Sequence, residues 1–409
     1  MSNWNFLKIK QIGTVITGKT PSKNAPSEWG EDYNFVTPSD YRNYFKYART
    51  SSRKLSELGF NSHKKRLIPK NSILVTCIGS DMGKTVLNSS HCFTNQQINA
   101  LIPNNSLIDY DFIYYLFKNN EAVFKSLGSD GTAVPILNKS DFENIEFLIP
   151  GLPEQKAIAS VLSSLDDKID LLHRQNKTLE SMAETLFRQR FIEECDNKWP
   201  LVLLGDFISC INGASYKSSE LLKSQKALVT LKNFARDGSF RKDGFKEYVG
   251  HYKLNQVVVD KDIVVAHTDL TQDASLIGNP IYVRNIIGYD TLVISMDLVK
   301  VELNSELLSK DFLFYLLKSS EFKDYALSCS NGSSVIHLSK KALPNYTFNL
   351  PPYERIASFS VIAESYYEKM SINTKSIQTL ETLRDTLLPK LMSGEVRVKY
   401  AEELIASVA

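Results

Sequence analysis

Gly79–Thr85 is the segment of the sequence that most resembles a site for phosphate chemistry. It reads Gly-Ser-Asp-Met-Gly-Lys-Thr, whereas a phosphate-binding loop of the form Gly-x-x-x-x-Gly-Lys-Thr surrounds a nucleotide with backbone amides and one lysine. That spacing requires a glycine at position 78, where this chain has Ile78. One position of the loop is therefore missing, and a P-loop nucleotide-binding protein is kept only as an alternative.

Asn349–Tyr353 could present a DNA base for methylation. It reads Asn-Leu-Pro-Pro-Tyr, which is the Asn-Pro-Pro-Tyr signature of adenine methylation with Leu350 inserted. The insertion would break the tight turn that presents the amino group of the base, and we see no Gly-rich cofactor loop after a strand. We therefore expect the chain to carry no methyltransferase chemistry and no catalytic residue.

The cysteines do not form a metal or disulfide pattern. Their number is odd and no two have the Cys-x-x-Cys spacing, so we expect neither a zinc site nor a disulfide framework. We interpret His91 beside Cys92 as ordinary packing, because two ligands without two more nearby do not hold a metal. The five residues are Cys77, Cys92, Cys195, Cys210 and Cys329.

Basic side chains gather in two stretches that also contain aromatic residues. Arg42–Lys70 has nine basic residues against one acid, and Lys217–Lys253 has nine against four. Basic groups with polar and aromatic neighbours are suited to the phosphates and base edges of DNA. A single charged run is usually a solvated surface, but two runs at matching places in a repeated chain favour DNA binding.

Composition limits the class of protein. The chain has 409 residues, 43% hydrophobic and 23% charged, as in ordinary globular proteins of two or three domains. The net charge of +2 excludes a uniformly basic surface. We find no apolar run near the ~20 residues of a membrane span and no N-terminal export signal. We therefore expect a cytoplasmic protein that does not contact membranes.

The chain repeats itself at an offset of roughly 190 to 201 residues. Asp111-Phe112 with Tyr115-Leu116 recurs as Asp311-Phe312 with Tyr315-Leu316. Two copies of one unit, related by a pseudo-two-fold symmetry, explain such a pattern. Other matching pairs are Trp4 and Trp199, Gly13 and Gly205, Val36-Thr37 and Val229-Thr230, Ile73–Val75 and Ile263–Val265, Gly131–Val134 and Gly332–Val335, and Leu179-Glu180 and Leu380-Glu381.

Each copy begins with a mixed region and ends with a long helical region. Prolines mark the changes, because proline disfavours helix in the preceding residue. The predicted segments are 1–150, 151–197, 198–350 and 351–409. Apolar patterns predict strands at 72–76, 256–259 and 281–283 and helices at 111–125 and 311–325. The fold class is therefore α/β or α+β with two duplicated domains and a pair of long helices.

Both helical regions carry an unbroken heptad pattern. The range 153–194 contains no proline or glycine, and each helix of about 40 residues would be roughly 60 Å long. One apolar stripe alone would suggest packing on its own domain, but two stripes, one ending each half, predict an antiparallel coiled coil. The two seams are Ile158, Leu162, Leu165, Ile169, Leu172, Asn176, Leu179, Ala183 and Leu186, and Phe359, Ala363, Tyr366, Met370, Asn373, Ile377, Leu380, Arg384 and Leu387.

Asn176 and Asn373 are polar exceptions in their seams. If the two side chains meet, a buried pair would cost stability but fix the register of the coiled coil. That alignment would oppose Ile169 to Leu380, Leu179 to Met370 and Ala183 to Tyr366.

The sequence resembles the specificity (S) subunits of type I restriction–modification enzymes, the HsdS family, over essentially its whole length. Tyr353–Arg355 departs from the family pattern, which favours Glu-Gln there, so the second copy is looser. The matching motifs are Gly18–Pro21, Val36–Asp40, Leu152–Ala159, Leu165–Asp170, Asn176–Phe187 and Leu387–Val396.

This resemblance implies that 1–150 and 198–350 are target recognition domains, each reading one half of a bipartite site in double-stranded DNA. The helices would set the spacer length and dock two methyltransferase (M) subunits, and restriction (R) subunits would complete an ATP-dependent nuclease. The chain would bind no cofactor itself: S-adenosylmethionine belongs to the M subunit, and ATP and Mg to the R subunit. A coiled-coil adaptor that binds only protein remains an alternative, which leaves the basic stretches unexplained.

Polar residues in turn-like parts of the mixed regions are our candidate DNA contacts, with no metal ligands among them. In the first domain they are Lys19, Thr20, Thr37, Ser39, Lys64, Lys65, Arg66, Lys84 and Thr132. In the second they are Lys217, Thr230, Lys232, Asn233, Arg236, Thr268, Gln272 and Ser333.

Overall fold

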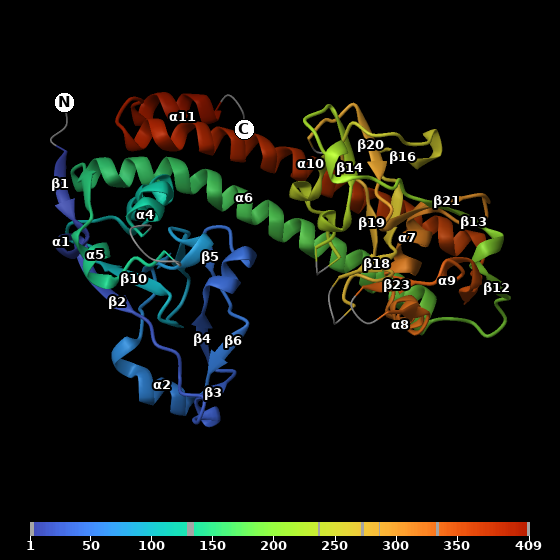
Figure 1. The fold of residues 1–409 in the computed structure, drawn as a ribbon, viewed down its shortest axis with the longest axis horizontal. Coiled ribbons are helices and arrows are strands. Elements are labelled where there is room, and N and C mark those ends of the chain that lie inside the picture. The colour runs from blue at the N-terminus through green and yellow to red at the C-terminus, as the bar shows by residue number, and fades with distance from the viewer. Residues whose placement is uncertain are drawn as a thin grey trace. The chain divides into compact units, whose positions relative to one another are not determined.

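The structure, a computed structural model, describes residues 4–128, 135–235, 238–270, 274–285, 287–332 and 335–406 (Figure 1). It divides into two compact units. Unit 1 comprises Met1–Arg174 and Ser376–Ala409, and unit 2 comprises Gln175–Lys375. Both boundaries fall inside long helices, so each unit includes part of both helices.

Unit 1 contains two sheets and a two-stranded ribbon. The five-stranded sheet has the order β2-β10-β7-β8-β5, antiparallel except for β5 against β8, and the four-stranded sheet has the order β3-β6-β4-β9. The ribbon pairs β1 with β11. The strands are β1 (Asn5–Lys8), β2 (Gly13–Thr17), β3 (Trp29–Gly30), β4 (Tyr33–Val36), β5 (Tyr47–Ala48), β6 (Arg53–Leu55), β7 (Ile73–Thr76), β8 (Thr85–Asn88), β9 (Phe93–Thr94), β10 (Ile98–Pro103) and β11 (Glu146–Ile149).

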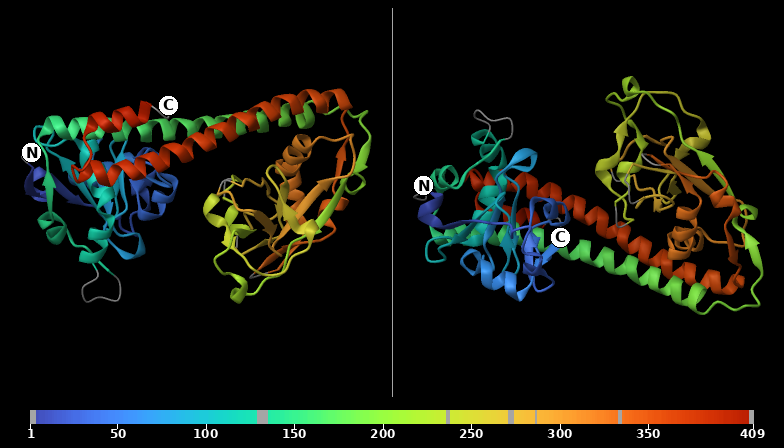
Figure 2. Two further views of the ribbon diagram at one scale, coloured as in Figure 1. Left: turned by 90° about the horizontal axis from the view of Figure 1, so that it is seen from above. Right: turned by 60° about the horizontal axis from the view of Figure 1, so that its bottom comes forward.

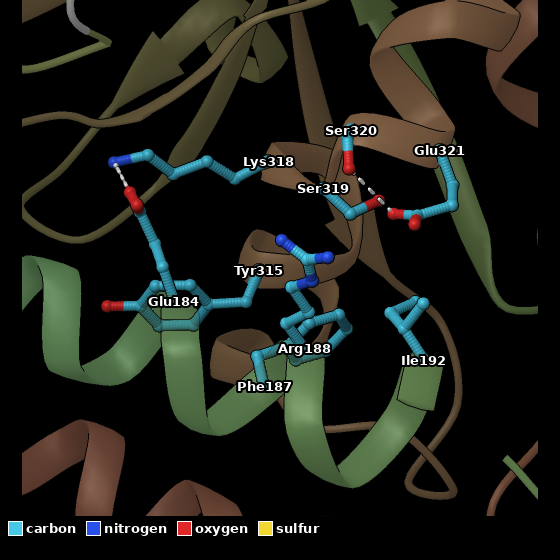
Figure 3. Close-up of a pocket in the computed structure, with 9 residues that line it drawn as sticks. All are labelled: Glu184, Phe187, Arg188, Ile192, Tyr315, Lys318, Ser319, Ser320 and Glu321. Atoms are coloured by element: carbon cyan, nitrogen blue, oxygen red, sulfur yellow. Dashed lines mark hydrogen bonds and ion pairs between the residues drawn. The ribbon is translucent and has the colours of Figure 1, made fainter. Parts of the chain in front are cut away.

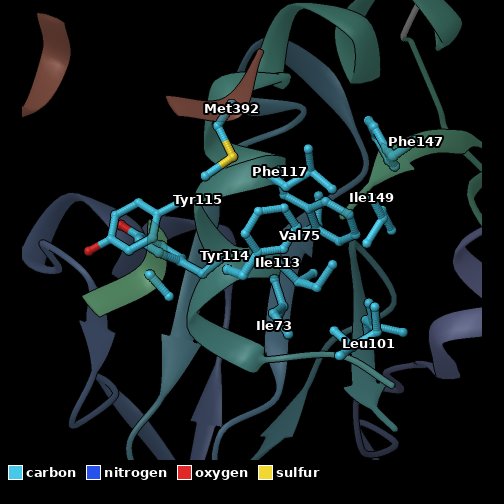
Figure 4. Packing of buried hydrophobic residues seen from close by; sticks show 14 of the residues in the cluster. Ile73, Val75, Leu101, Ile113, Tyr114, Tyr115, Phe117, Phe147, Ile149 and Met392 are labelled. Atoms are coloured by element: carbon cyan, nitrogen blue, oxygen red, sulfur yellow. The ribbon is translucent and has the colours of Figure 1, made fainter. Parts of the chain in front are cut away.

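One large core joins the five-stranded sheet of unit 1 to its helices. Figure 4 shows α3 side chains such as Tyr114 and Phe117 beside Ile73 of β7 and Leu101 of β10, with Met392 nearby. The bounds are α1 (Ile9–Ile12), α2 (Glu57–His63), α3 (Tyr110–Asn119), α4 (Glu121–Leu127) and α5 (Lys139–Asn144).

Unit 2 repeats this plan with fewer strands in the main sheet. That sheet has the order β13-β21-β17-β19, and the others are β15-β14-β20-β16, β18-β23-β22 and the ribbon β12-β24. The strands are β12 (Leu201–Leu203), β13 (Ile208–Asn212), β14 (Lys226–Val229), β15 (Lys246–Glu247), β16 (Val257–Val258), β17 (Ile263–Ala266), β18 (Thr268–Asp269), β19 (Pro280–Tyr282), β20 (Thr291–Ile294), β21 (Leu298–Leu303), β22 (Ser330–Asn331), β23 (Ile336–Leu338) and β24 (Thr347–Asn349).

The duplication extends to individual backbone hydrogen bonds. The Lys19 amide donates to the Thr94 carbonyl at 2.9 Å, and the Ala214 amide donates to the Ile294 carbonyl at 2.7 Å. Gly18 and Gly213 precede these donors, and a Cβ on either glycine would lie within 2.2 Å of a facing carbonyl oxygen. In unit 1 the loop after β2 therefore packs against the turn between β9 and β10, and in unit 2 the loop after β13 packs against the turn between β20 and β21.

The predicted strands are confirmed as β7, β16 and β19, but each predicted mixed-region helix is broken in two. In unit 2, α7 (Lys310–Lys318) ends before Ser319, whose extended backbone and hydroxyl cap α8 (Ser320–Ser328). The Ser319 cap competes with continuation of the helix. In unit 1, Asn120 separates α3 from α4 and its side chain donates to the Leu116 carbonyl at 2.7 Å.

The long helices are α6 (Leu152–Phe187) and α10 (Tyr353–Met392). Within unit 1, Ile169 and Leu172 pack with Ile377 and Leu380. Within unit 2, Ala183 lies in one core with the α10 residues Phe359, Ala363 and Tyr366. In unit 1 the pair Asp166–Arg384 precedes the cluster of Ile169 and Leu172 with Ile377 and Leu380, and in unit 2 the pair Asn176–Asn373 precedes the core of Ala183 with the earlier α10 residues. The helices are therefore antiparallel within each unit.

Shorter helical elements accompany the long helices. A π-helical turn over Arg188–Glu193 replaces the end of the predicted first helix and keeps Phe191 in the core of unit 2. The helix α9 (Ala342–Asn345) precedes β24. Figures 1 and 2 show α11 (Val398–Ala406) beside the last part of α10, and Ala401 is buried in the core of unit 1.

Candidate nucleic-acid interface

Much of the basic stretch Arg42–Lys70 contacts the protein itself. Lys46 is buried, and its Nζ lies 2.7 Å from Asp111 Oδ1 and 2.8 Å from Ser163 Oγ of α6. Arg49 pairs with Asp170 of the same helix at 2.8 Å. These two cations hold the mixed region of unit 1 against α6. Lys46 is too buried to contact DNA, whereas the paired Arg49 stays about half exposed.

Two more cations of this stretch pack on the surface of unit 1. The Arg53 guanidinium lies 3.5 Å from the centroid of the Trp29 ring, a cation–π arrangement. Lys54 pairs with Glu31 at 3.3 Å. The prediction that the whole stretch forms a DNA-binding patch is therefore too broad.

A basic surface remains, which we call surface 1. It consists of four exposed cations and one partly buried threonine: Lys19, Lys64, Lys65, Arg66 and Thr20. Lys64–Arg66 form one exposed 3₁₀ turn, and the Arg66 guanidinium donates to the Thr17 carbonyl at the end of β2, at 2.5 Å. Thr20 donates to the side chain of Gln96 at 2.9 Å. The structure thus brings these five predicted residues together from two separate loops.

Sequence reasoning missed the amide-rich turn beside surface 1. The turn between β9 and β10 contains Asn95, Gln96 and Gln97, and the Asn95 amide donates to Gln97 Oε1 at 2.9 Å. Asparagine and glutamine are side chains that pair with adenine edges in the major groove. The signal was available, because three consecutive amide residues between two strand-like runs are visible in the sequence.

The edge of surface 1 carries an acidic side chain, Glu28. Glu28 contacts the His63 ring at 3.0 Å. Hydrogen bonds from His63 and Ser62 lower the pKa of Glu28, and the charge of Lys19 contributes. Glu28 therefore stays ionised beside the lysines and limits the positive field on that side.

The other predicted contacts of the first domain lie in two further places. Thr37 accepts and donates hydrogen bonds around Asp40 and Ser39 at the start of the 3₁₀ turn Pro38–Asn43, with distances of 2.8 Å. Lys84 is exposed and pairs with Asp81 at 2.7 Å. Strand β8, not a helix, follows Lys84, so the geometry of a nucleotide-binding loop is absent from this segment.

In unit 2, Lys217 and Lys232 are exposed, but two predicted neighbours are not. Thr230 is 4% exposed and donates to the Gly244 carbonyl at 2.9 Å, and Asn233 is 0% exposed and donates to the Arg241 carbonyl at 2.8 Å. The prediction that Thr230 and Asn233 contact DNA is replaced by a structural role. They cap the 3₁₀ turn that presents Lys232.

Thr268 is also buried, and its hydroxyl donates to Asp297 at 3.0 Å, so it too has an internal role. The neighbouring His267 is partly buried, and desolvation, with His337 and Lys340 adding to it, lowers its pKa. Four further predicted contacts, Thr132, Arg236, Gln272 and Ser333, lie outside the described residues.

Polar contacts join the long helices within each unit. In unit 2 the Asn373 amide donates to Asn176 Oδ1 at 2.8 Å, which is the contact of the expected register. In unit 1 Arg384 pairs with Asp166 at 2.8 Å. Burial opposes the charge of Arg384, but Asp166 and Asp385 raise its pKa above the usual value, so it stays a cation inside the helix pair.

A small cavity of about 160 Å³ lies in unit 2 between the end of α6 and the α7–α8 corner. Figure 3 shows Lys318 and Glu184 joined at one side of it. Lys318 pairs with Glu184 at 2.8 Å and also with Glu180, and despite burial these carboxylates raise its pKa. The cation is thus neutralised within the protein.

The segment Asn349–Tyr353 and the possible metal ligands show no sign of a reactive site among the described residues. Asn349 ends β24, and its amide donates to Cys195 Sγ at 3.3 Å. Within 4–128, 135–235 and the later described ranges, no three His, Cys, Asp or Glu side chains converge as metal ligands would. The helices found there are all too short or too polar to cross a membrane.

Comparison with known proteins identifies the family. The family described as "Type I restriction modification DNA specificity domain" matches this chain twice, over residues 1–181 and 196–382. The two matches coincide with the two repeats of the fold. The chain belongs to this DNA specificity family.

Two curated relatives and one solved structure illustrate the likeness. The MjaIX specificity subunit of Methanocaldococcus jannaschii is 27% identical over 97% of this chain and 94% of the relative. The HindI specificity subunit of Haemophilus influenzae is 32% identical over 45% of this chain and 40% of the relative. The crystal structure of an S subunit from M. genitalium has a TM-score of 0.59 at 18% identity, covering 95% and 96% of the two chains.

Proposed function

We propose that this chain is the DNA specificity subunit of a type I restriction–modification complex and that it does no chemistry itself. The double family match, once on each repeat, is the observation that carries the proposal. In this proposal residues 1–150 and 198–350 are target recognition domains. Each reads one half of a bipartite, asymmetric sequence in double-stranded DNA, and the spacer between the halves is not read.

Surface 1 is the proposed DNA contact of the first domain. Its lysines and Arg66 are exposed, and phosphate contacts require such cations. Gln96 beside Thr20 adds a group able to contact a base edge. Ser39 and Lys84 remain proposed peripheral contacts, since both are exposed.

The second domain has a different proposed contact set. Lys217 and Lys232 are exposed at the ends of short turns that follow β13 and β14. The turn of unit 2 that corresponds to the amide-rich turn of unit 1 contains Ser295, Met296 and Asp297 instead. Different side chains on equivalent turns support the proposal that the two halves of the target differ in sequence.

The long helices are the proposed docking sites for two M subunits. Leu171 of α6 and Ile372 of α10 occupy matching positions in the two copies and are 40% and 58% exposed. Exposed apolar side chains repeated in this way suit two copies of one partner. S-adenosylmethionine would come with the M subunits, and ATP and Mg with R subunits, so this chain needs no cofactor of its own.

Methylation mapping tests the proposed function. The chain is co-expressed with its candidate M subunit, and methylated adenines are located by sequencing. A motif of two parts separated by a fixed gap is expected, and exchange of residues 1–150 for those of a relative should alter only one part. A contiguous motif would contradict the proposal, and no methylation would favour a protein-binding adaptor.

Arg66→Ala tests surface 1 in a DNA-binding titration of the complex. Because one phosphate contact is lost, affinity should fall on all sequences alike. The slope of the logarithm of the binding constant against the logarithm of the salt concentration should become shallower by about one. Lys54→Ala, which removes a cation already paired with Glu31, is the matched control and should leave the slope unchanged. An unchanged slope in Arg66→Ala would remove Arg66 from the proposed contact.

A further inference from the structure

A largely buried lysine contacts the equivalent aspartate in both copies of the repeat. Asp111 lies in the first turn of α3 and Asp311 in the first turn of α7. Lys46 Nζ lies 2.7 Å from Asp111 Oδ1, and Lys261 Nζ lies 3.2 Å from Asp311 Oδ1. Only 1% and 18% of these lysine side chains are exposed. The two ammonium groups thus occupy equivalent places.

The two lysines come from different positions of the repeat. Lys46 directly precedes β5, a strand that the main sheet of unit 2 lacks. Lys261 lies in the turn before β17, with φ of 65°, and its amide donates to the Val283 carbonyl. Its counterpart in unit 1 is Asn71, with φ of 64° and an amide that donates to the Asn88 carbonyl. The two ammonium groups therefore lie at equivalent places in the fold, although the lysines that carry them stand at different positions of the repeat.

Each ammonium group also reaches a long helix at matching positions. Lys46 donates to Ser163 of α6 at 2.8 Å, and Lys261 pairs with Glu364 of α10. Ser163 and Glu364 are 201 residues apart, which is the offset of the repeat in this part of the chain. Lys46 therefore joins the first turn of α3 to α6, and Lys261 joins the first turn of α7 to α10.

Aromatic rings enclose both ammonium groups. Lys46 Nζ lies 5.0 to 5.7 Å from the ring centroids of Tyr47, Tyr114 and Tyr115. Lys261 Nζ lies 5.0 Å from Tyr367 and 5.8 Å from Tyr282. Such rings favour a cation electrostatically while they exclude water. A buried cation is strongly destabilising unless its partners are in place, so this contact tolerates little rotation or sliding.

We propose that Lys46 and Lys261 are positioning residues that fix the orientation of each recognition region on its long helix and thereby determine the spacer length of the DNA target. This inference rests on the proposed function. Apolar packing alone allows a domain to shift by small steps, because it has no directional partner. A cation placed between one aspartate and one helix side chain supplies that direction.

The test combines Lys46→Met with Asp111→Asn. Lys46→Met keeps the length of the side chain but leaves the buried carboxylate of Asp111 without its cation, so the unfolding temperature should fall. Lys46→Met/Asp111→Asn removes both charges, so the unfolding temperature should recover. Lys54→Met is the matched control for loss of a surface lysine in the same stretch. Lys46→Arg keeps a cation.

Methylated sites are then mapped for each variant co-expressed with the M subunit, and spacer lengths are counted. In both variants that lack the Lys46 charge, methylation at the native spacer should fall about tenfold, equivalent to about 1.4 kcal/mol, and sites one base pair longer or shorter should appear with unchanged half-sites. Lys46→Arg and Lys54→Met should keep the native spacer. Lys261→Met/Asp311→Asn repeats the test in the second copy.

The outcome separates positioning from stability. If Lys46→Met/Asp111→Asn regains both its unfolding temperature and the native spacer, the contact only stabilises the fold and the inference is overturned. If Lys46→Met fails to fold, the double variant still decides the question. A wild-type complex without any two-part motif would refute the proposed function instead.

Discussion

The contact between Asn176 and Asn373 predicts an unequal response to two similar substitutions. Asn373 is 1% exposed, whereas Asn176 is partly exposed. The Asn373 amide donates to Asn176 Oδ1 at 2.8 Å, and Gln175 Oε1, at 3.5 Å, is its next acceptor. We consider Asn176→Leu, Asn373→Leu and the double variant.

The expected magnitudes follow from burial. In Asn176→Leu the buried amide of Asn373 loses its close acceptor, and an unsatisfied buried polar group costs about 1–3 kcal/mol. Gln175 offsets part of that loss, so we expect about 1–2 kcal/mol. In Asn373→Leu the remaining Asn176 still reaches water, so the loss should be smaller. The double variant has no unsatisfied amide and buries more apolar surface, so it should be at least as stable as the wild type.

Guanidinium unfolding followed by far-UV circular dichroism measures these differences, and the four proteins form a double-mutant cycle. The cycle should give a coupling energy of about 2 kcal/mol between the two positions. Equal losses in the two single variants would refute the argument from burial. A double variant less stable than either would refute the argument that the asparagines form one hydrogen-bonded unit.

Two other predictions concern thiols and pH. Burial raises the pKa of Cys77 and Cys92 to about 12, although hydrogen bonds from Asn99 and Asn88 act in the opposite direction. Both thiols should therefore react with a disulfide reagent only on unfolding, which a reagent titration of the native protein measures. Rapid reaction of Cys92 in the native protein would contradict this. Because the pKa of His267 is lowered below 6.5 in the folded state, the unfolded state binds more protons. The free energy of unfolding should therefore decrease as pH falls below 6.5, and His267→Gln should reduce that decrease; an unchanged pH profile would show that the histidine does not cause it.

The helix pair was predictable because its apolar residues repeat with a regular heptad spacing in the sequence. Heptad spacing identifies the contacting face of each helix, and one asparagine in each seam selects one alignment, Asn176 with Asn373. The pair Arg384 and Asp166 is consistent with that alignment, since it places a charged seam residue opposite an acid. The breaks after α3 and α7 were less predictable, because apolar spacing continues through both. At α7 the capping Ser319 competes with that spacing, and at α3 the Asn120 side chain donates back to the Leu116 carbonyl.

The basic stretches were harder to interpret because a sequence does not show where a cation's partner lies. Lys46 and Arg49 lie in the same basic stretch as the exposed Lys64 and Lys65, but their partners Asp111 and Asp170 are far away in sequence. By contrast, the buried roles of Thr230 and Asn233 could have been recognised. A threonine followed three residues later by an amide side chain is a capping signature.

Unit 1 is assembled from both ends of the polypeptide, and this has a consequence for how the protein is made. Its core includes Leu387, Leu391 and Ala401 together with Ile158 and Leu162. During synthesis, residues 4–174 leave the ribosome while the parts of α10 and α11 that pack against them are still untranslated. Unit 2 can therefore complete its core first, whereas unit 1 keeps an uncovered apolar helix face until Leu387, Leu391 and Ala401 have been made. Chains that terminate prematurely within α10 should accordingly be targets for chaperones and proteases.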